Sequence, residues 1–262
     1  PQIVLGLVVN ADGFPVAYEL FAGNTFEGHT LIPVIKAFKK RHKIAALTVV
    51  ADAAMISMGN ILALAKNGIQ YIVGARMGNI SQTRAVQIRS GLAETDGATV
   101  RVKTDLGDLV ADFSLKRYRK DKRDLEQQIE KAEKVIAHPA KAKRTKFVKV
   151  GDGAYQLHTE LVEKAKGLLG IKGYYTNLGA ETSEQAIVTQ YHGLWHVEQA
   201  FRVAKSDLAM RPIFHFKADA IKVHVLICFM ALAVSKYMEI KTGASLRRIV
   251  TSLQHVTDAT LI

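Results

Sequence analysis

The sequence predicts an α/β protein in which helices pack on a mixed sheet. Its first 75 residues contain apolar runs that read, in order, as strand, strand, helix, strand, helix and strand. An alternation of this kind is typical of a sheet with helices on its faces. The length of 262 residues and the hydrophobic fraction of 48% allow one large domain, or one domain that carries an insertion.

The elements of this first part follow from apolar periodicity and turn residues. The turn between the two opening strands is the sequence ADG at 11–13, and Gly68 closes the second helix. The hairpin, the first helix, the third strand, the second helix and the fourth strand are expected at residues 2–21, 31–42, 46–50, 58–67 and 69–74.

The chain changes character from about residue 82, where short polar strands surround a highly charged helix. The strands are expected at 98–104, at 109–115 and in a hairpin at 146–159, and the helix at 116–136. The segment from Lys116 to Lys149 holds 13 Lys or Arg against 5 Asp or Glu, a net charge of +8. Two interpretations stay open. One is a solvated helix with pairs such as Glu130 and Lys134; the other is contact with nucleic-acid phosphates, favoured by the acid-free run at 141–149.

The last part of the chain is expected to be helical after a strand at 173–177. Residues 182–184 supply an N-cap with an acid in the first turn, and the helix they begin is expected to continue through Ser206. A final helix is expected at 218–236. Its apolar run at 223–234 is too short to span a bilayer and predicts a buried helix and no membrane.

These changes divide the chain into a core at 1–82, a β-rich insertion with a basic helix at 83–178, and the rest of the core at 179–262. Lys and Arg outnumber Asp and Glu by 36 to 24, so the net charge of +12 indicates a polyanionic partner. The single cysteine, Cys228, excludes an internal disulfide. Because the opening PQIVLGLVVN also lacks the basic start of a signal peptide, the sequence predicts a cytoplasmic protein.

One helical segment, YHGLWHVEQAFRVAK, gathers polar residues at a regular spacing. Tyr191, Glu198 and Lys205 are seven residues apart and are expected to share a helix face, with Arg202 one turn beyond Glu198. Trp195 lies beside the neighbouring apolar stripe and is expected in the core, with stacking on an unpaired base as the alternative. On periodicity alone, a surface ion pair between Glu198 and Arg202 is the plainest explanation.

Asp52 points to a second explanation. It follows a buried apolar strand directly, where an acid is unusual unless it binds something, and where ligands collect in α/β sheets. A strand-end Asp and a helical Glu can together hold Mg²⁺ or Mn²⁺, because hard cations favour carboxylate oxygens. Asp52 and Glu198 are therefore the candidate metal ligands.

The segment from Tyr191 to Lys205 resembles the Y-x2-R-x3-E-x6-K signature of DDE transposases from bacterial insertion sequences. Tyr191, Glu198 and Lys205 match three of the four positions, and Leu194 stands where Arg is usual. The upstream VVADAAMIS and FAGNTFEGHT and the downstream SDLAMRPIFHFKADAIKVHVLICFMALAV are also similar to this family. The resemblance covers nearly the whole chain.

The resemblance implies an RNase H-like (retroviral-integrase-like) core that is interrupted by the β-rich insertion. It implies that Asp52 and Glu198 are the second and third catalytic acids and bind two Mg²⁺ or Mn²⁺ ions, while Tyr191, Arg202 and Lys205 contact DNA. The first acid is expected on a strand before PQIVLGLVV, and no residue of this chain matches it, so the fragment is expected to be inactive alone. The implied partners are double-stranded DNA, as element ends and target, and a second copy of the protein, in a bacterial cytoplasm at the nucleoid.

The implied reaction is metal-dependent cleavage and strand transfer by in-line displacement at phosphorus. Two other functions stay open. One is an RNase H-fold nuclease without strand transfer. The other is a DNA-binding transposase remnant that does no chemistry, which the unmatched first acid favours.

Overall fold

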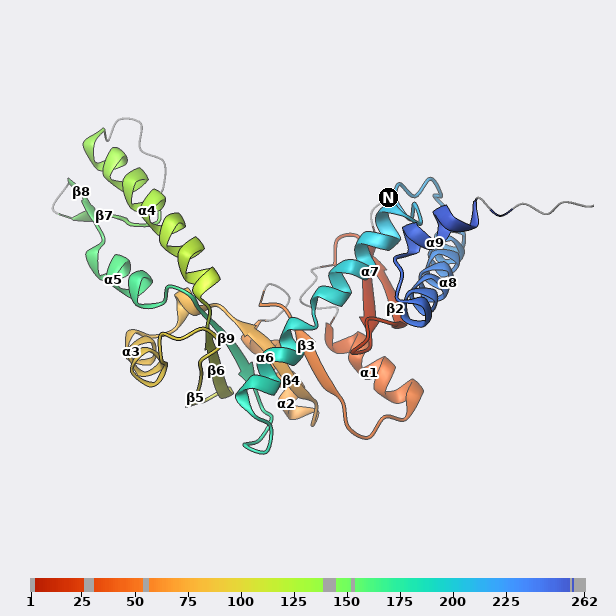
Figure 1. Ribbon diagram of the computed structural model, residues 1–262, viewed down its shortest axis with the longest axis horizontal. Coiled ribbons are helices and arrows are strands. Elements are labelled where there is room, and N and C mark those ends of the chain that lie inside the picture. Colours follow the sequence, from red (N-terminus) through yellow and green to blue (C-terminus); the bar gives the residue numbers. More distant parts are fainter. Residues whose placement is uncertain are drawn as a thin grey trace, which may run out of the picture. The chain divides into compact units, whose positions relative to one another are not determined.

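The computed structural model describes residues 3–25, 31–53, 57–138, 145–151, 154–254 and 256. The chain forms two compact units, each made of separate segments (Figure 1). The first, here called the hairpin unit, comprises Pro1–Leu47, Ala54–Asn67 and His192–Ile262. The second, called the sheet unit, comprises Thr48–Ala53 and Gly68–Tyr191.

The hairpin unit begins with the antiparallel pair β1 (Ile3–Val9) and β2 (Pro15–Ala22), which confirms the predicted hairpin. The Asn10 side chain accepts hydrogen bonds from the amides of Asp12 and Phe14, so the turn is held by a local side chain. Gly13 completes the turn with a φ of +78°, a conformation that favours glycine.

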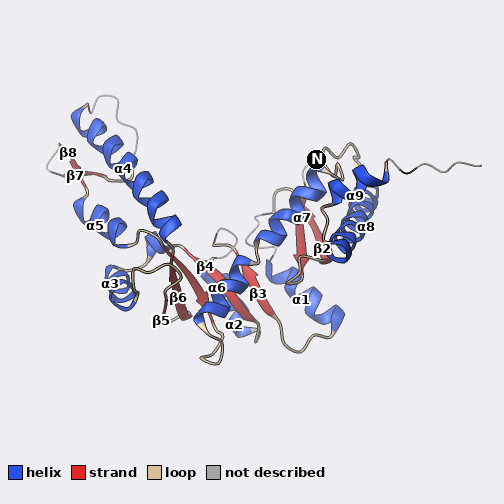
Figure 2. Ribbon diagram, in the orientation of Figure 1, coloured by secondary structure: helices blue, strands red, loops and turns tan. Residues whose placement is uncertain are grey.

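Five helices belong to the described part of the hairpin unit. They are α1 (Leu31–His42), α2 (Met58–Lys66), α7 (Trp195–Ser206), α8 (Ala218–Thr242) and α9 (Leu246–Leu253). Helix α7 packs on β1 and α8 packs on α7. α8 also packs on β2, beside which it is drawn in Figure 2. Buried residues of α7, of α8 and of the segment between them form one cluster: Ala200, Ala204, Met210, Cys228 and Leu232.

The sheet unit is built on a five-stranded sheet in the order β3-β4-β9-β6-β5. The strands are β3 (Thr48–Ala51), β4 (Gln70–Ala75), β5 (Thr99–Thr104), β6 (Gly107–Phe113) and β9 (Ile171–Thr176). The pair β3 and β4 is parallel and the other pairs are antiparallel, so the sheet is mixed, as predicted. The hairpin β1-β2 forms a two-stranded sheet of its own within the described residues, whereas the sequence predicts one sheet.

Strands from the predicted insertion complete this sheet. β9 pairs with β4 on one side and with β6 on the other, so residues far apart along the chain share one core. The short helices η2 (Met77–Asn79) and α3 (Gln82–Gly91) precede β5, and α6 (Glu184–His192) follows β9. Together with β5 and β6, α3 buries an apolar cluster that includes Ile88, Val102 and Leu109.

The charged helix of the insertion is α4 (Leu115–Ala137), which agrees with the helix predicted at 116–136. It packs against the hairpin of β7 (Val148–Gly151) and β8 (Ala154–Leu157) and against α5 (Thr159–Gly167). A small core of Leu125, Ala132, Phe147 and Val162 holds these elements together. The run at 141–149 lies only partly within the described residues.

Two predictions about helices are wrong. The helix expected to continue through Ser206 stops at His192, and α7 starts at Trp195 after a turn at Gly193 and Leu194. The amides of His196 and Val197 bond to the carbonyls of Gly193 and Leu194, three residues back, so α7 begins with its own tight turn. Tyr191 and Glu198 therefore lie on different helices and in different units, and not on one helix face.

The second correction concerns α8, which is buried on one side only. Val223, Ile227, Met230 and Val234 fall within the run expected to be buried, and all four are more than half exposed. By length and composition alone, α8 is the one described helix that is able to cross a membrane, although a core helix passes the same test.

Candidate functional site

Asp52 is placed by the end of a buried strand. Val49 and Ala51 of β3 are buried, and Ala51 pairs with Val73 of the neighbouring β4. Asp52 follows immediately and is exposed, so the carboxylate stands at the carboxyl end of β3 at the surface of the sheet unit. This is the position that the sequence predicts for it.

Tyr191 reaches Asp52 from the last turn of α6. Its side chain is buried, with the residue 5% exposed, and its hydroxyl donates a hydrogen bond to Asp52 Oδ1 at 3.4 Å. That distance is longer than the usual value of about 2.8 Å for such bonds, so the contact contributes little to the stability of the fold. Sequence analysis placed both residues at one site but expected Tyr191 to face DNA.

The Tyr191 ring is fixed by its neighbours on β9. Its centroid lies 4.5 Å from that of Tyr174, and Lys172 Nζ lies 4.4 Å from the Tyr191 centroid, within cation–π range. On β4, Gly74 leaves the space that the hydroxyl needs. A Cβ atom at Gly74 would lie 2.5 Å from Tyr191 Oη and 3.1 Å from the amide nitrogen of Ala53.

Asp112 and Arg117 fix the hydroxyl end of Tyr174. Its hydroxyl donates to Asp112 Oδ1 at 2.7 Å, and Arg117 Nη1 lies 3.3 Å from Asp112 Oδ2. Burial, together with the hydrogen bond and the negative charge of Asp112, raises the pKa of the Tyr174 phenol above its ordinary value. Tyr174 therefore stays protonated and presents a neutral ring to Tyr191.

Arg101 ties the start of α6 to the sheet. From β5 its Nε donates to Glu184 at 2.8 Å, and its Nη1 donates to Asp108 at 3.2 Å and to the Gly179 carbonyl at 3.1 Å. Its Nη2 also donates to the Thr182 carbonyl. Because this guanidinium is only 12% exposed, it fixes the segment that leads into α6 and hence the direction from which Tyr191 approaches Asp52.

The other predicted site residues lie on α7 in the hairpin unit. Glu198, Arg202 and Lys205 are all exposed, and Lys205 Nζ lies 5.6 Å from the Phe201 ring centroid. Among the ion pairs of the described residues there is none between Glu198 and Arg202, so the plain explanation of their spacing is not observed. Trp195 is 54% exposed, which corrects its predicted place in the core.

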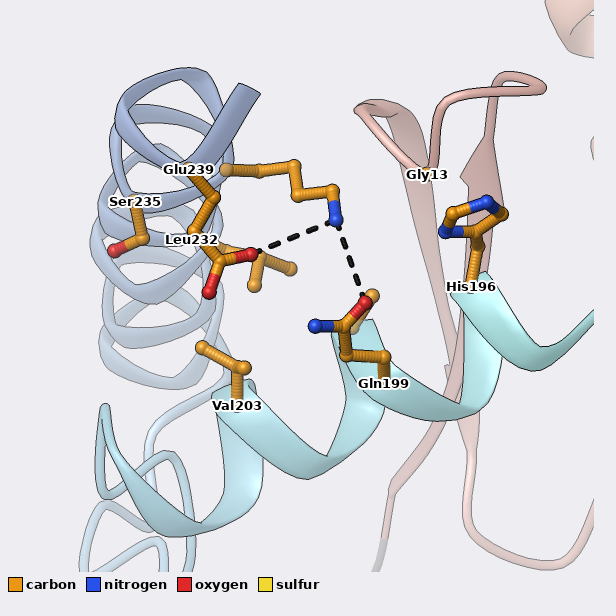
Figure 3. A pocket seen from close by; sticks show the side chains of 9 residues that line it. Gly13, His196, Gln199, Val203, Leu232, Ser235 and Glu239 are labelled. Atoms are coloured by element: carbon orange, nitrogen blue, oxygen red, sulfur yellow. Dashed lines mark hydrogen bonds and ion pairs between the residues drawn. The ribbon is translucent and has the colours of Figure 1, made fainter. Parts of the chain in front are cut away.

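The inner side of α7 is held by a partly buried polar cluster (Figure 3). Lys236 Nζ of α8 donates to Gln199 Oε1 at 3.4 Å and lies 3.5 Å from Glu239 Oε2. His196 faces Gly13 of the hairpin turn, and burial followed by the charge of Lys236 lowers the pKa of its imidazole. These contacts fix α7 so that Glu198 stands on its solvent side.

In the sheet unit the structure brings Tyr191 to Asp52. In the hairpin unit it places Glu198, Arg202 and Lys205 on the exposed side of α7. Within the described residues, no group of three His, Cys, Asp or Glu is arranged to hold a metal ion. Exposed carboxylates do have the chemistry that Mg²⁺ prefers. Sequence reasoning missed Gly74, Lys172, Tyr174 and Arg101, since only the strand pairing brings them to the site.

Comparison with known protein families gives one match. The family described as Transposase DDE domain matches residues 1–234. No curated protein and no solved structure matches the chain. Because the family match spans most of the 262 residues, including Asp52, Tyr191, Glu198 and Lys205, this chain belongs to the Transposase DDE domain family.

Proposed function

We propose that this chain is the catalytic domain of a DNA transposase with an RNase H-like core, formed by residues 1–82 and 179–262 around an insertion at 83–178. It acts on the DNA ends of an insertion sequence, by cleavage and strand transfer. The observation that carries the proposal is the contact between Tyr191 and Asp52, 139 residues apart in the sequence. A tyrosine of the family signature meets a strand-end carboxylate, which is hard to explain by packing alone because Asp52 is exposed.

In this proposal Asp52 and Glu198 hold divalent ions, Mg²⁺ or Mn²⁺. When bound, such ions activate a water or a DNA 3′-hydroxyl and stabilise the leaving oxygen at phosphorus. Tyr191 keeps the Asp52 carboxylate in one orientation. Arg202 and Lys205 bind backbone phosphates, Arg through two parallel donors and Lys as a point charge.

The test of this proposal is Mg²⁺-dependent nicking, by the full protein, of a plasmid that carries the element ends. Asp52→Asn and Glu198→Gln should each lower the rate by at least about 100-fold.

Asp207→Asn is the matched control, because Asp207 is an exposed acid at the end of α7. Its rate should equal that of the parent. Full activity in Glu198→Gln would contradict the assignment. Cleavage without joining to target DNA would favour a nuclease, and end binding without cleavage by the full protein would favour a DNA-binding remnant.

The proposed DNA contacts extend to α4. Its exposed basic residues are Lys116, Arg119, Lys120, Lys122, Arg123, Lys131 and Lys134, and of these Lys134 is paired with Glu130 at 2.6 Å. The slope of log affinity against log salt is negative. Changing Lys120 and Arg123 to Glu should reduce the magnitude of this slope by about 2. The ion pair of Lys134 with Glu130 lies on the surface and contributes little to the free energy of unfolding, so Lys134→Gln should not alter the fold.

A further inference from the structure

The outer side of α8 carries an uninterrupted row of large apolar side chains. Val223, Ile227, Met230, Val234 and Tyr237 are each 51% to 59% exposed. Their positions are four, three, four and three residues apart, and Leu226 and Ile240 flank the row with exposures of 42% and 48%. This spacing of four and three is the heptad pattern by which two helices pack lengthwise.

The row lies on the side of α8 opposite to the one that packs within the hairpin unit. Ile221, Val225, Cys228 and Leu232 are buried, and α8 makes its contacts to β2 and α7. From Val225 to Val234 the helix is therefore apolar around its whole circumference, while only one side is covered by the described residues. Helices that are apolar all round are normally covered on every side.

Charged residues are absent from the outer row between Val223 and Tyr237. The Lys236 ammonium lies in the same stretch but turns inward to Gln199 and Glu239, with its side chain only 14% exposed. On a chain with a net charge of +12, most surfaces of two copies repel one another. Two copies can approach one another through an uncharged face without this electrostatic repulsion.

We propose that the row from Val223 to Tyr237, here called the α8 seam, is a dimer interface in which the α8 helices of two copies pack lengthwise. The interface is self-complementary, as a two-fold axis requires. Seven side chains that are each about half exposed bury on the order of 1,000 Å² over two copies, which is at the lower bound for a specific interface. β-branched Ile227 and Val234 at one heptad position also suit a two-stranded seam.

The inference is independent of the catalytic proposal, and it names the surface for the second copy that the family resemblance implies. It is tested on the full protein without DNA, by sedimentation over a range of concentrations. The parent should dimerise, and the pair Ile227→Glu and Val234→Glu should raise the dissociation constant by about 100-fold. Leu62→Glu is the matched control, since Leu62 is equally exposed, at 54%, on α2 of the same unit; it should dimerise like the parent.

Cysteine cross-linking tests the geometry without relying on variant stability. In a Cys228→Ala background, Met230→Cys lies at the middle of the seam and should form a disulfide between copies in either helix direction. Val223→Cys should cross-link only if the two helices run parallel, because an antiparallel pair places its two copies at opposite ends of the seam.

Three outcomes would overturn the proposal. The first is a parent that stays monomeric up to about 100 µM, since a specific interface of this size binds more tightly. The second is a dimer that Ile227→Glu and Val234→Glu leave intact. The third is a monomeric parent that binds phosphatidylcholine vesicles through Ile227 and Val234, which would assign the seam to a lipid surface. None of these readouts depends on cleavage, so they separate a failed interface from a failed catalytic assignment.

Discussion

The Tyr191 hydroxyl donates to Asp52 Oδ1 across 3.4 Å, and so links the last turn of α6 to the end of β3. Both residues belong to the sheet unit, so the contact is internal to one compact body. The tyrosine is buried and the carboxylate is exposed. This is the arrangement expected if Tyr191 orients the Asp52 carboxylate for the proposed metal ion, because the tyrosine is fixed while the carboxylate stays open to solvent.

Replacing Tyr191 by Phe should weaken metal binding without unfolding the protein. The ring keeps its packing on Tyr174 and its contact with Lys172, and the donor to Asp52 is lost. A typical hydrogen bond contributes about 1 kcal/mol and this longer one less, so we expect the Mn²⁺ affinity of the full protein to fall by no more than about fivefold. Calorimetric titration measures it. Tyr174→Phe removes a different hydroxyl, which bonds to Asp112, and should leave the affinity unchanged.

A side chain at Gly74 should displace Tyr191 from Asp52. The Cβ of an alanine would lie 2.5 Å from the tyrosine hydroxyl and 3.1 Å from a backbone nitrogen, so either the ring or β4 must move. We expect Gly74→Ala to cost about 2 kcal/mol in urea denaturation and to lower the Mn²⁺ affinity as well. Gly78→Ala meets no atom within 4 Å and should change neither quantity. Equal stability of the two variants would contradict this geometry.

Replacing Arg101 by lysine should destabilise the sheet unit. Its Nε and Nη1 bond to Glu184, Asp108 and the Gly179 carbonyl from one planar group, which a single ammonium cannot match. Arg101→Lys is expected to lower the free energy of unfolding by about 2 kcal/mol and to increase hydrogen exchange at the start of α6. Lys103→Met, which removes a cation that is 90% exposed beside the same Asp108, should cost less than about 0.5 kcal/mol.

The first part of the fold could be predicted because its signals are local. The turn at 11–13, the periodicity of 31–42 and the short apolar strand before Asp52 fix the elements from β1 to β4 nearly to the residue. Asp52 itself is visible as an acid after an apolar run. In contrast, α3 and α5 were missed. The sequence QTRAVQIRSG of α3 has few apolar residues, and Ser81, whose side chain caps the helix, was its one clear signal.

What the sequence could not predict depends on contacts between distant segments. The spacing of seven between Tyr191 and Glu198 continues through Gly193, so only the tertiary structure shows that the helix is interrupted there. The pairing of β9 with β4 brings Tyr174 and Gly74 to Tyr191, from positions that are 100 residues apart in the chain. The exposed side of α8 was unexpected for the same reason, since composition shows how apolar a helix is and not how many sides are covered.

Stability of the sheet unit should fall at high pH through Tyr174. An unfolded chain loses the tyrosine proton near pH 10, whereas burial and Asp112 raise the pKa of Tyr174 in the folded state. The unfolded state therefore binds fewer protons above about pH 10, and the free energy of unfolding decreases as the pH rises from there. In urea titrations, Tyr174→Phe should show a smaller decrease than the parent between about pH 10 and 11. Tyr155→Phe, which alters an exposed hydroxyl, should follow the parent.

The hairpin turn and α7 should depend on the absence of a side chain at Gly13. Its φ of +78° disfavours other residues, and a Cβ there would lie 2.8 Å from Nδ1 and 2.9 Å from Cβ of His196. The second distance matters more, because the imidazole can turn but the His196 Cβ is fixed to α7. Gly243 offers a matched control in the same unit, with a φ of +68° and no atom within 4 Å of an added Cβ.

Gly243→Ala should therefore cost only the backbone strain, about 1 kcal/mol, while Gly13→Ala adds the clash and should cost about 3 kcal/mol. Urea denaturation of both variants measures the difference. The double variant Gly13→Ala with His196→Ala removes the imidazole but retains the His196 Cβ position, so it should recover only part of the loss. Full recovery would mean that the imidazole alone makes the clash, and no difference between Gly13→Ala and Gly243→Ala would mean that the turn does not pack on α7.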